Sequence, residues 1–584
     1  MKIHLTQTAI GICYSLYLSC MCTNIVQAQD PIWARTYGGS GVDIANLTIE
    51  TTDGGYLIAG QSMSNDGDLT FNIGLRDFWI IKTELNGDTA WTRIFGGSLN
   101  EYANSIIETS DGGYLIGGAT FSNDGDVWGN HGGADCWLVK TDLYGDTMWT
   151  KTYGGTGTEW ISQILESSDG GYLFTGPTTS NDGDVWGNHG DYDYWLVKTD
   201  LYGDTLWTKT YGGTDSDNPN SVIETTDGGY LLAGYATSND GDVSGNHGDW
   251  DCWLVKTDIN GDTIWTKTYG GMWEELAYDV IETSDGHYLA VGLTASDDGD
   301  ISGNHGVWDC LMLKVDPNGN LIWANVYGGS SVDQASMVIE TLDGDYVFAG
   351  QTNSNDGDVW GNHGDYDYWL VKTDPNGDTL WTRTYGGTTE DIAYSITNTS
   401  DNHYLLAGYA ISNNGDVSGN HGSHDYWILK VKDLTCAIDT SVSSNATTLT
   451  AIDTGGTFQW LDCDNGHAPI TNAMDQNYTP ASSGNYAVEI TKGSCKDTSS
   501  CHNFTVVGIK RNIEYGIGIY PNPTTGIITI LNIEGTARVY DVYGRLVITS
   551  KTNTVDISQE DKGVYFVKIH DKKGLDHFGK LIKK

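Results

Sequence analysis

The sequence has few basic residues and few prolines. Lysine and arginine number 30 against 77 aspartates and glutamates, and the formal net charge is −47. Nucleic acid is therefore excluded as an expected partner, because contacts to phosphates need a basic face. Proline contributes 9 residues, whereas glycine contributes 76 and tryptophan 21. This composition is typical of an all-β protein with many tight turns.

Long apolar runs are confined to the N-terminus. Lys2, an apolar stretch over residues 9–21 and the small residues of Val26-Gln27-Ala28 predict a signal peptide over residues 1–28. The stretch is too short for a transmembrane anchor, and lipoprotein cleavage before Cys20 is the remaining alternative. No later segment is apolar enough to span a membrane, so we expect an exported protein without a transmembrane segment.

Signatures of catalysis are missing as well. The sequence contains no GxSxG elbow, no HExxH motif, no P-loop and no dinucleotide glycine fingerprint. Acidic pairs are frequent, which leaves a glycosidase pair open. The same acidic pairs recur throughout the chain, however, and this weakens the choice of any single pair.

The dominant feature is a repeat of 58 residues. Seven tryptophans occur at this spacing without an insertion, and each opens a phrase like WTKTYGG: Trp33, Trp91, Trp149, Trp207, Trp265, Trp323 and Trp381. A fixed period of this length predicts one supersecondary unit per repeat. So regular a chain also argues against an enzyme, because a catalytic site needs asymmetry.

One repeat predicts four antiparallel strands. In the unit that begins at Asn220 they are residues 221–226, 230–236, 252–258 and 263–271. An Asp-Gly-Gly turn joins the first two, and Asn260-Gly261 closes the hairpin between the last two, since Asn-Gly readily takes the positive φ of such turns. Four antiparallel strands in 58 residues predict a propeller blade.

The count of strands predicts a closed ring over residues 29–434. The last repeat ends at Leu434 without a fourth strand, and the strand at Trp33 has no blade before it. If this strand completes the seventh blade, no open edge remains between the termini. The fold class is therefore an all-β, seven-bladed β-propeller. An open solenoid is the alternative, but its ends would expose unpaired faces.

Two short motifs resemble those of known propellers. The hairpin KTDxxGDTxW resembles the tryptophan-docking repeat of quinoprotein propellers, with an Asp-to-Trp spacing one residue shorter. The DGG turn is similar to the Asp-box hairpin of sialidase-type propellers, although the following Thr-Trp is missing. Both resemblances imply blade construction, with a structural role for the seven tryptophans, and neither brings catalytic or cofactor residues.

The long loop of each repeat, SNDGDVWGNHGxxD, lies on the same predicted face as the YGG connection. Its carboxylates surround a glycine, as in calcium sites, although the spacing does not fit the helical twelve-residue calcium loop. The alternative is that they cap turns through bonds to the backbone. The candidate calcium ligands are Asp124, Asp126, Asp135, Asp182, Asp184, Asp193, Asp240, Asp242, Asp251, Asp356, Asp358 and Asp367.

Six repeats carry a histidine in this loop, at His131, His189, His247, His305, His363 and His421. A ring of metal ligands would require all of them to converge on the axis. Positions in the middle of a loop lie too far apart for that, so a turn-stabilising role is the favoured interpretation.

Aromatic residues interleave with these acids, at Trp128, Trp186, Trp250, Trp308, Trp360, Tyr192 and Tyr366. Flat rings beside carboxylates and amides suit sugar recognition. The alternative is that the rings cover blade edges. The candidate ligand-binding residues are Trp128, Trp186 and Trp360, together with Trp160 and Trp273, which are not repeated.

Ten cysteines divide by position. Cys13, Cys20 and Cys22 belong to the signal peptide, and Cys136, Cys252 and Cys310 occupy a repeat position that holds Phe or Tyr elsewhere, which predicts inert buried thiols. Cys436, Cys463, Cys495 and Cys501 cluster after the repeats, where an exported chain keeps disulfides in any of three connectivities.

Residues 435–510 and 511–584 differ from the repeats. The phrases WLDCDNGHAPI and SGNYAVEI resemble immunoglobulin-like modules of secreted Bacteroidota proteins, which implies a spacer with Trp460 in its core. The phrases IYPNPTTGIITI, ARVYDVYGRLV, GVYFVKI and KLIKK resemble the type A C-terminal sorting domain of the type IX secretion system, a small β-sandwich. This resemblance implies recognition at the outer membrane, removal of the domain and secretion or surface display. The alternative is an ordinary β domain.

These features predict a secreted or cell-surface protein that binds or adheres without catalysis. Polysaccharide is the candidate ligand, calcium the candidate supporting ion, and the type IX secretion machinery the expected partner. An extracellular glycan hydrolase on a propeller scaffold and a purely structural surface protein are the alternatives. The propeller fold alone supports none of them over the others.

Overall fold

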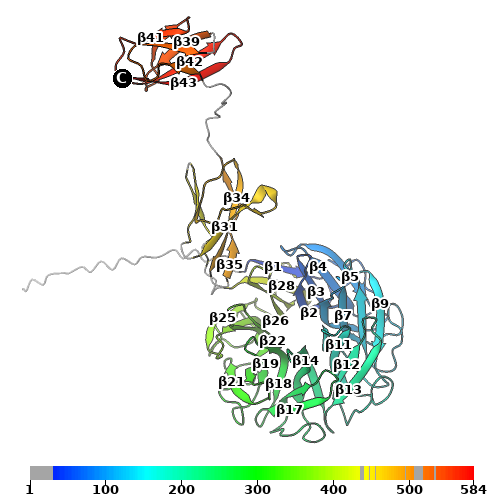
Figure 1. Ribbon diagram of the computed structural model, residues 1–584. Helices are drawn as coiled ribbons and strands as arrows, with labels where there is room; N and C mark the ends of the chain where they lie inside the picture. Colours follow the sequence, from blue (N-terminus) through cyan, green and yellow to red (C-terminus); the bar gives the residue numbers. More distant parts are fainter. Residues whose placement is uncertain are drawn as a thin grey trace, which may run out of the picture. The chain divides into compact units, whose positions relative to one another are not determined.

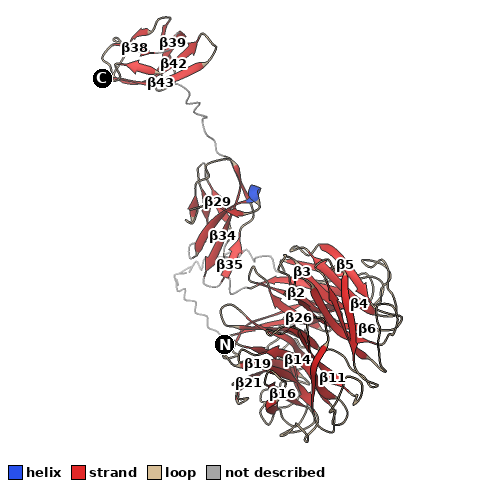
Figure 2. Ribbon diagram, turned by 45° about the vertical axis from the view of Figure 1, so that its right-hand side comes forward, coloured by secondary structure: helices blue, strands red, loops and turns tan. Residues whose placement is uncertain are grey.

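The computed structural model describes residues 31–433, 438, 440–445, 447–453, 456–492, 495–505, 517–531 and 535–584. The predicted signal peptide lies outside them. Strands dominate these residues, as Figure 2 shows, and the one helix among them is the single turn η1 (Cys463–Asn465). No described helix is long and apolar enough to cross a membrane.

Seven four-stranded antiparallel sheets form the blades of the propeller. Blades 1 to 3 contain β2 (Asp43–Glu50), β3 (Tyr56–Ser62), β4 (Asp77–Thr83), β5 (Thr89–Phe95); β6 (Glu101–Glu108), β7 (Tyr114–Thr120), β8 (Asp135–Thr141), β9 (Thr147–Tyr153); and β10 (Gln163–Glu166), β11 (Tyr172–Thr178), β12 (Asp193–Thr199), β13 (Thr205–Tyr211). Blades 4 and 5 contain β14 (Asp217–Glu224), β15 (Tyr230–Ala236), β16 (Asp251–Thr257), β17 (Thr263–Tyr269); and β18 (Glu275–Glu282), β19 (Tyr288–Thr294), β20 (Asp309–Val315), β21 (Leu321–Tyr327). Blades 6 and 7 contain β22 (Asp333–Glu340), β23 (Tyr346–Thr352), β24 (Asp367–Thr373), β25 (Thr379–Tyr385); and β26 (Asp391–Asn398), β27 (His403–Ala410), β28 (Asp425–Lys432), β1 (Trp33–Tyr37).

The ring closes as the sequence predicts. Strand β1 pairs with β28, with Trp33 opposite Lys430 and Tyr37 opposite Tyr426, and so supplies the outer strand of blade 7. The first strand of each blade packs against the first strands of both neighbouring blades and lines the axis (Figure 1). Closure leaves no unpaired edge between the ends of the ring.

The strand bounds differ from expectation mainly on the inner strands. In blade 4, β15 has the expected bounds, whereas β14 begins at Asp217 instead of Ser221. The register shifts between Pro219 and Ser221, so Asn220 is a bulge residue. A bulge breaks the alternation of inward and outward side chains, which is why the beginning of this strand could not be read from the pattern.

Two sets of tryptophans build the core between blades. Trp79, Trp137, Trp195, Trp253, Trp369 and Trp427, on the third strand of their blades, are fully buried. The seven evenly spaced tryptophans are half-buried, and five of them, Trp33, Trp91, Trp149, Trp207 and Trp265, pack on a glycine turn of the next blade. At Gly261, for example, φ is +76° and the ring of Trp207 lies where a Cβ would project, so only glycine suits the turn and the packing.

The region after the propeller forms two antiparallel sheets. One contains β29 (Val442–Ser444), β30 (Leu449–Ala451) and β33 (Asn477–Tyr478); the other contains β31 (Thr457–Asp462), β32 (Ala468–Pro469), β34 (Gly484–Lys492), β35 (Cys495–Thr498) and β36 (His502–Phe504). Trp460 is fully buried, as expected. The immunoglobulin-like classification stays a prediction.

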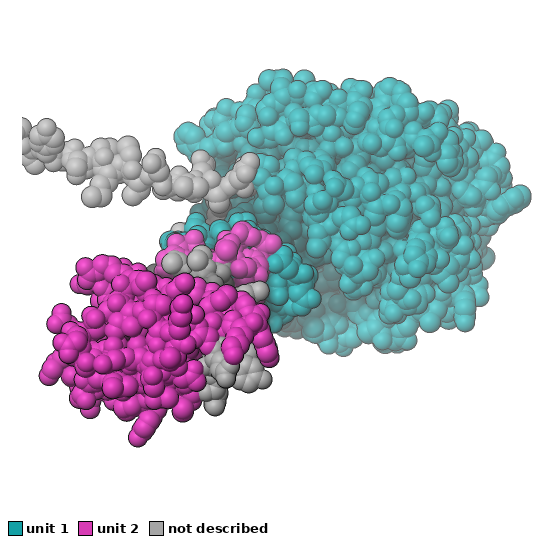
Figure 3. Space-filling model, turned by 90° about the horizontal axis from the view of Figure 1, so that it is seen from above, with its two compact units in different colours: residues 1–443, 450–478, 486–502 teal, residues 444–449, 479–485, 503–584 magenta. Residues whose placement is uncertain are grey.

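The C-terminal region also has two sheets. They contain β37 (Gly518–Tyr520), β38 (Ile527–Leu531) and β41 (Thr554–Asp556), and β39 (Gly535–Tyr540), β40 (Leu546–Ser550), β42 (Gly563–Asp571) and β43 (Asp576–Lys583). Ile528, Val539, Val567 and Leu581 are buried between them. Figure 3 colours the two compact units of the chain, and the C-terminal region belongs to the second.

Cysteines follow the expected division. Cys136, Cys252 and Cys310 are free and buried, and burial raises the pKa of each thiol, which makes them inert. Cys463 and Cys501 form a disulfide. Cys436 and the side chain of Cys495 lie outside the described residues.

Candidate ligand-binding face of the propeller

The Asp-Gly-Asp triplets tie each long loop to the YGG connection on the same face. In blade 2, Asp124 Oδ1 accepts a hydrogen bond from Ser98 N at 2.7 Å, and Asp126 Oδ2 accepts one from Gly96 N at 3.2 Å. The same pair of contacts recurs in the other blades whose triplets are candidate calcium ligands, at Asp182 and Asp184, Asp240 and Asp242, and Asp356 and Asp358. These bonds satisfy the turn-capping interpretation of the carboxylates.

The last aspartate of each loop is fully buried, and in six of the seven loops it faces a histidine. Asp135 Oδ2 lies 2.6 Å from His131 Nδ1 and accepts a hydrogen bond from His131 N. Asp193, Asp251 and Asp367 make the same contacts with His189, His247 and His363. The histidines thus close the turns, as favoured from the sequence.

Burial raises the pKa of these aspartates above the ordinary value of an aspartate. It raises the pKa of Asp135, Asp193 and Asp367 to about 6, although the histidine bonds act in the opposite direction. A second fully buried carboxylate, such as Glu159, begins the next blade and adds to the effect at Asp135. The first glycine of YGG, Gly154, passes so close to both carboxylates that a Cβ there would lie 2.7 Å from Glu159 Oε2.

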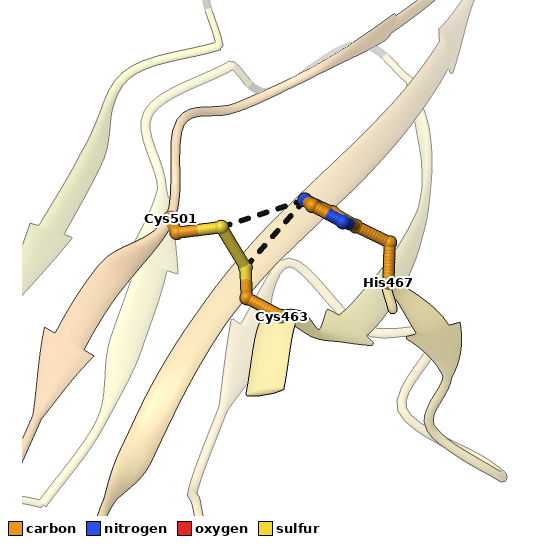
Figure 4. Close-up of side chains that lie close together, drawn as sticks. All are labelled: Cys463, His467 and Cys501. Carbon is orange, nitrogen blue, oxygen red and sulfur yellow. Dashed lines mark hydrogen bonds between the residues drawn. A yellow bond between two sulfur atoms is a disulfide. The ribbon is translucent and has the colours of Figure 1, made fainter. Parts of the chain in front are cut away.

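The candidate calcium ligands are not gathered into one cluster. Among the described residues, the one group of three or more His, Cys, Asp or Glu with ligand atoms close enough to share a metal is Cys463, His467 and Cys501. Figure 4 shows its geometry: His467 Nε2 lies 3.7 Å from Cys463 Sγ and 3.4 Å from Cys501 Sγ. Because these two sulfurs form a disulfide, they are not thiolate ligands.

The rim of the ring presents three exposed indoles. Trp128, Trp186 and Trp360 are 74%, 71% and 75% exposed. The backbone carbonyl of each accepts a hydrogen bond from a threonine on the outer strand of its own blade, at Thr152, Thr210 and Thr384. The loop is therefore held while its ring remains free to contact a ligand. The equivalent position is Thr70, Ser244, Ser302 or Ser418 in the other blades.

A hollow of about 630 Å³ breaks the symmetry of this face at blades 3, 4 and 5. Trp160, predicted from its lack of repetition, lines it, whereas Trp273 is exposed and does not. The other lining residues are Asp191, Tyr192, Asp215, Ser216, Asn218, Tyr235, Thr237, Asp249, Trp250 and Glu274.

Two aromatic pairs and four carboxylates give the hollow its chemistry. Trp160 and Tyr192 have ring centroids 5.5 Å apart, and Tyr235 stacks on Trp250 at 5.0 Å. Asp191 Oδ2 accepts a hydrogen bond from Ser216 Oγ at 2.9 Å. Sequence reasoning missed the hollow because its four rings come from a strand and three connecting segments of two blades. At the repeat position of Tyr235, only Tyr235 and Tyr409 are aromatic. This rarity is the signal in the sequence that could have pointed to the hollow.

The axis of the ring is lined by polar side chains. A cavity of about 120 Å³ lies between the bulge residues of the inner strands. Asn220 Nδ2 donates to Ala277 O at 2.8 Å and Ser221 Oγ donates to Asp279 Oδ1 at 3.0 Å, so each side chain links one blade to the next. Burial raises the pKa of Asp279, the one acid that lines this cavity, to about 6.

Comparisons with known proteins identify the C-terminal region. Residues 518–584 match the family model described as "Secretion system C-terminal sorting domain". Regulatory protein FlaEY of Caulobacter vibrioides is 25% identical over 264 residues, which cover 42% of this chain and 26% of that protein, so the match spans about a quarter of the relative.

Solved structures with similar folds include Sqt1 from Chaetomium thermophilum, at 8% identity and a TM-score of 0.36, covering 69% of this chain and 100% of that one. Another is YCF48 bound to D1 peptide, at 9% identity and a TM-score of 0.36, covering 69% and 96%. The match to the family model shows that, after the seven blades of the propeller, the chain carries the sorting domain with which the type IX secretion system directs proteins to the cell surface or the extracellular space.

Proposed function

We propose that this protein is a non-catalytic binding or adhesion protein that contacts polysaccharide through the rim of its propeller. The observation that carries the proposal is the exposure of Trp128, Trp186 and Trp360 at one repeat position. An exposed indole offers a flat apolar face on which a sugar ring stacks, and the neighbouring loop offers acceptors for its hydroxyl groups. Three such rings on one molecule favour multivalent contact with a polymer, where avidity exceeds the affinity of a single ring.

A glycan array probed with the full chain tests this function. Replacing Trp128, Trp186 and Trp360 together with alanine should abolish binding, whereas each single replacement should weaken it. The matched control replaces Ser244, Ser302 and Ser418 with alanine, which alters the same position in three blades without removing a ring. Equal binding by the triple tryptophan variant and the control would refute the proposal.

Calcium is proposed as a supporting ion of the same loops. In blade 2, Asp124 and Asp126 each use one carboxylate oxygen in the bonds described above, and the other oxygen is available to a hard cation. In blades 3 and 4, the equivalent second oxygens of Asp182 and Asp240 accept hydrogen bonds from Thr156 and Thr214. Adding calcium should then raise the melting temperature relative to chelator, and Asp124→Asn with Asp126→Asn should reduce that increase. An identical melting temperature in calcium and chelator would contradict this role.

The hydrolase alternative is supported by one observation, the four carboxylates that line the hollow. Incubation of array-positive glycans with the full chain distinguishes the two functions. Release of reducing ends would favour hydrolysis, and intact glycan in the bound fraction favours binding.

A further inference from the structure

The hollow on blades 3 to 5 is acidic and contains no compensating cation. Asp191, Asp215, Asp249 and Glu274 line it, and no lysine, arginine or histidine does. None of these four carboxylates forms an ion pair within the described part of the chain. The hollow therefore lacks the positive charge that its walls would attract.

Elsewhere on the same face, an arginine lies over the aromatic ring that is the repeat equivalent of Trp160. Tyr102 in blade 2 is the repeat equivalent of Trp160 in blade 3. The guanidinium of Arg76, from blade 1, lies 5.0 Å above the Tyr102 ring. A guanidinium over an aromatic ring is a favourable cation–π arrangement.

The corresponding cation is missing at the hollow. The repeat equivalent of Arg76 beside Trp160 is Ala134, whose side chain is a buried methyl group. Both residues hold the same backbone place, since Glu101 N donates to Arg76 O and Glu159 N donates to Ala134 O, each at 2.7 Å. The chain thus places an arginine over Tyr102 but only a methyl group beside Trp160. Ala134 itself does not line the hollow, and the two residues at the Arg76 repeat position that do line it, Tyr192 and Trp250, are also uncharged.

We propose that the hollow binds an arginine side chain presented by a protein partner. The planar guanidinium can lie on the Trp160 or Trp250 ring and donate two parallel hydrogen bonds to a carboxylate such as Asp249 or Glu274. A lysine or an amino-sugar ammonium also carries the positive charge that the hollow attracts, but it cannot donate two parallel hydrogen bonds from one planar group. This site is separate from the rim indoles and does not depend on the proposed function.

Calorimetric titration of the full chain with acetyl-Gly-Arg-Gly-amide tests the proposal. The neutral control is the same tripeptide with citrulline, which keeps the shape and removes the charge. The arginine peptide should bind at least about tenfold more tightly than the citrulline peptide. Its affinity should fall as salt rises, because screening weakens the attraction of the partly exposed carboxylates.

Substitutions locate the binding to the hollow. Asp249→Asn with Glu274→Gln should weaken arginine-peptide binding by at least about tenfold, since two charged acceptors are lost. Asp365→Asn is the matched control, because Asp365 has the repeat position of Asp249 but lies in blade 6, outside the hollow. Ala134→Arg should block the peptide by supplying the missing guanidinium from within the chain. Unchanged melting temperatures show that each variant is folded.

Three results would overturn the proposal. They are equal affinity for the arginine and citrulline peptides, undiminished binding by the Asp249→Asn and Glu274→Gln variant, and binding of a glucosamine tetramer in place of the peptide. The last would assign the hollow to amino sugars. The variant without the three rim tryptophans should still bind the arginine peptide, so failure of the polysaccharide function and failure of this inference are distinguishable.

Discussion

At the scale of single residues, the buried lysines explain how charge is accommodated inside the blades. Lys256 is almost fully buried, and its Nζ donates to Asp227 Oδ1 at 2.9 Å and to Thr225 Oγ1 at 3.0 Å. Every blade pairs the equivalent lysine with the first aspartate of the turn between its first two strands, which reads DGG in four blades and DGH, DGD or DNH in the others. The lysines are Lys82, Lys140, Lys198, Lys256, Lys314, Lys372 and Lys430.

Lys256→Met should therefore lower the free energy of unfolding by about 1–3 kcal/mol, because charged hydrogen bonds in a buried site are lost. Chemical denaturation measures the change. Lys267→Met, at an exposed lysine of the same blade, is the control and should leave stability unaltered. An effect of equal size at both positions would show that the ion pair is not the cause.

The buried aspartates of the loops predict the pH dependence of stability. Burial raises the pKa of Asp135, Asp193 and Asp367 to about 6, well above the value near 4 of an unfolded aspartate. The folded state then holds protons that the unfolded state releases, so this contribution is present below about pH 4 and is lost as pH rises through 6. Melting temperatures should be higher at pH 5 than at pH 7.5.

The same experiment on Asp135→Asn isolates one blade. The amide is neutral at every pH, so the variant should lose part of the difference between pH 5 and pH 7.5, and Asp365→Asn, at an exposed carboxylate, should lose none. A difference that is the same in both variants would attribute the pH dependence to the overall charge of the chain.

Single residues were predictable where repetition made their role visible. The histidines were correctly interpreted as turn-stabilising, because six copies in mid-loop cannot converge on one metal. The buried lysines were missed, because a charged residue in an alternating strand is expected to face solvent, and only the fold brings the DGG aspartate to Lys256. Trp160 was identified by its irregularity, but its partners Tyr235 and Trp250 depend on a contact between blades.

At the scale of elements, side-chain clasps join the turn of one blade to the inner strand of the next. Glu224 accepts hydrogen bonds from Ser168 N and Ser168 Oγ, and five other junctions repeat the arrangement. Between blades 6 and 7 the residues are instead Leu342, which is 78% exposed, and Asn398. A cavity of about 330 Å³ lies at this junction.

Leu342→Ser combined with Asn398→Glu should restore the missing clasp. Two new hydrogen bonds are expected to stabilise the protein by about 1–2 kcal/mol, which thermal or chemical denaturation can measure. Glu224→Ala, which removes an existing clasp, should have the opposite effect. If both variants destabilise the protein, the junction between blades 6 and 7 is not equivalent to the others.

The elements themselves were largely readable from the sequence. Four strands per repeat follow from alternation and turn residues, and β15 has the predicted bounds. The inner strand β14 extends further because the bulge at Asn220 hides its beginning. The bulge places Asn220 and its equivalents on the axis, and no local pattern indicates this. Four of these residues, Asn46, Asn104, Ser162 and Asn220, donate a hydrogen bond to the next blade.

At the scale of the whole molecule, the domains should respond differently to reductant. The disulfide between Cys463 and Cys501 spans 38 residues of the middle region, whereas the propeller cysteines are free and buried. A disulfide of this span typically stabilises its domain by about 2–4 kcal/mol. In calorimetry, dithiothreitol should lower the unfolding temperature of the middle region, residues 435–510, and should leave the unfolding temperature of the propeller unchanged. A shift of the propeller transition by the same amount would contradict this prediction.

The closure of the ring makes the propeller sensitive to its own completeness. Strand β1 is the first described strand of the chain, yet its partner β28 ends at Lys432, so nearly the entire repeat array must be present before β1 has anything to pair with. A copy that stops a few dozen residues early leaves two open strand edges, which are prone to aggregation and proteolysis. An incomplete chain therefore differs from a complete one in the strand edges that it exposes, and this difference does not depend on any particular sequence motif.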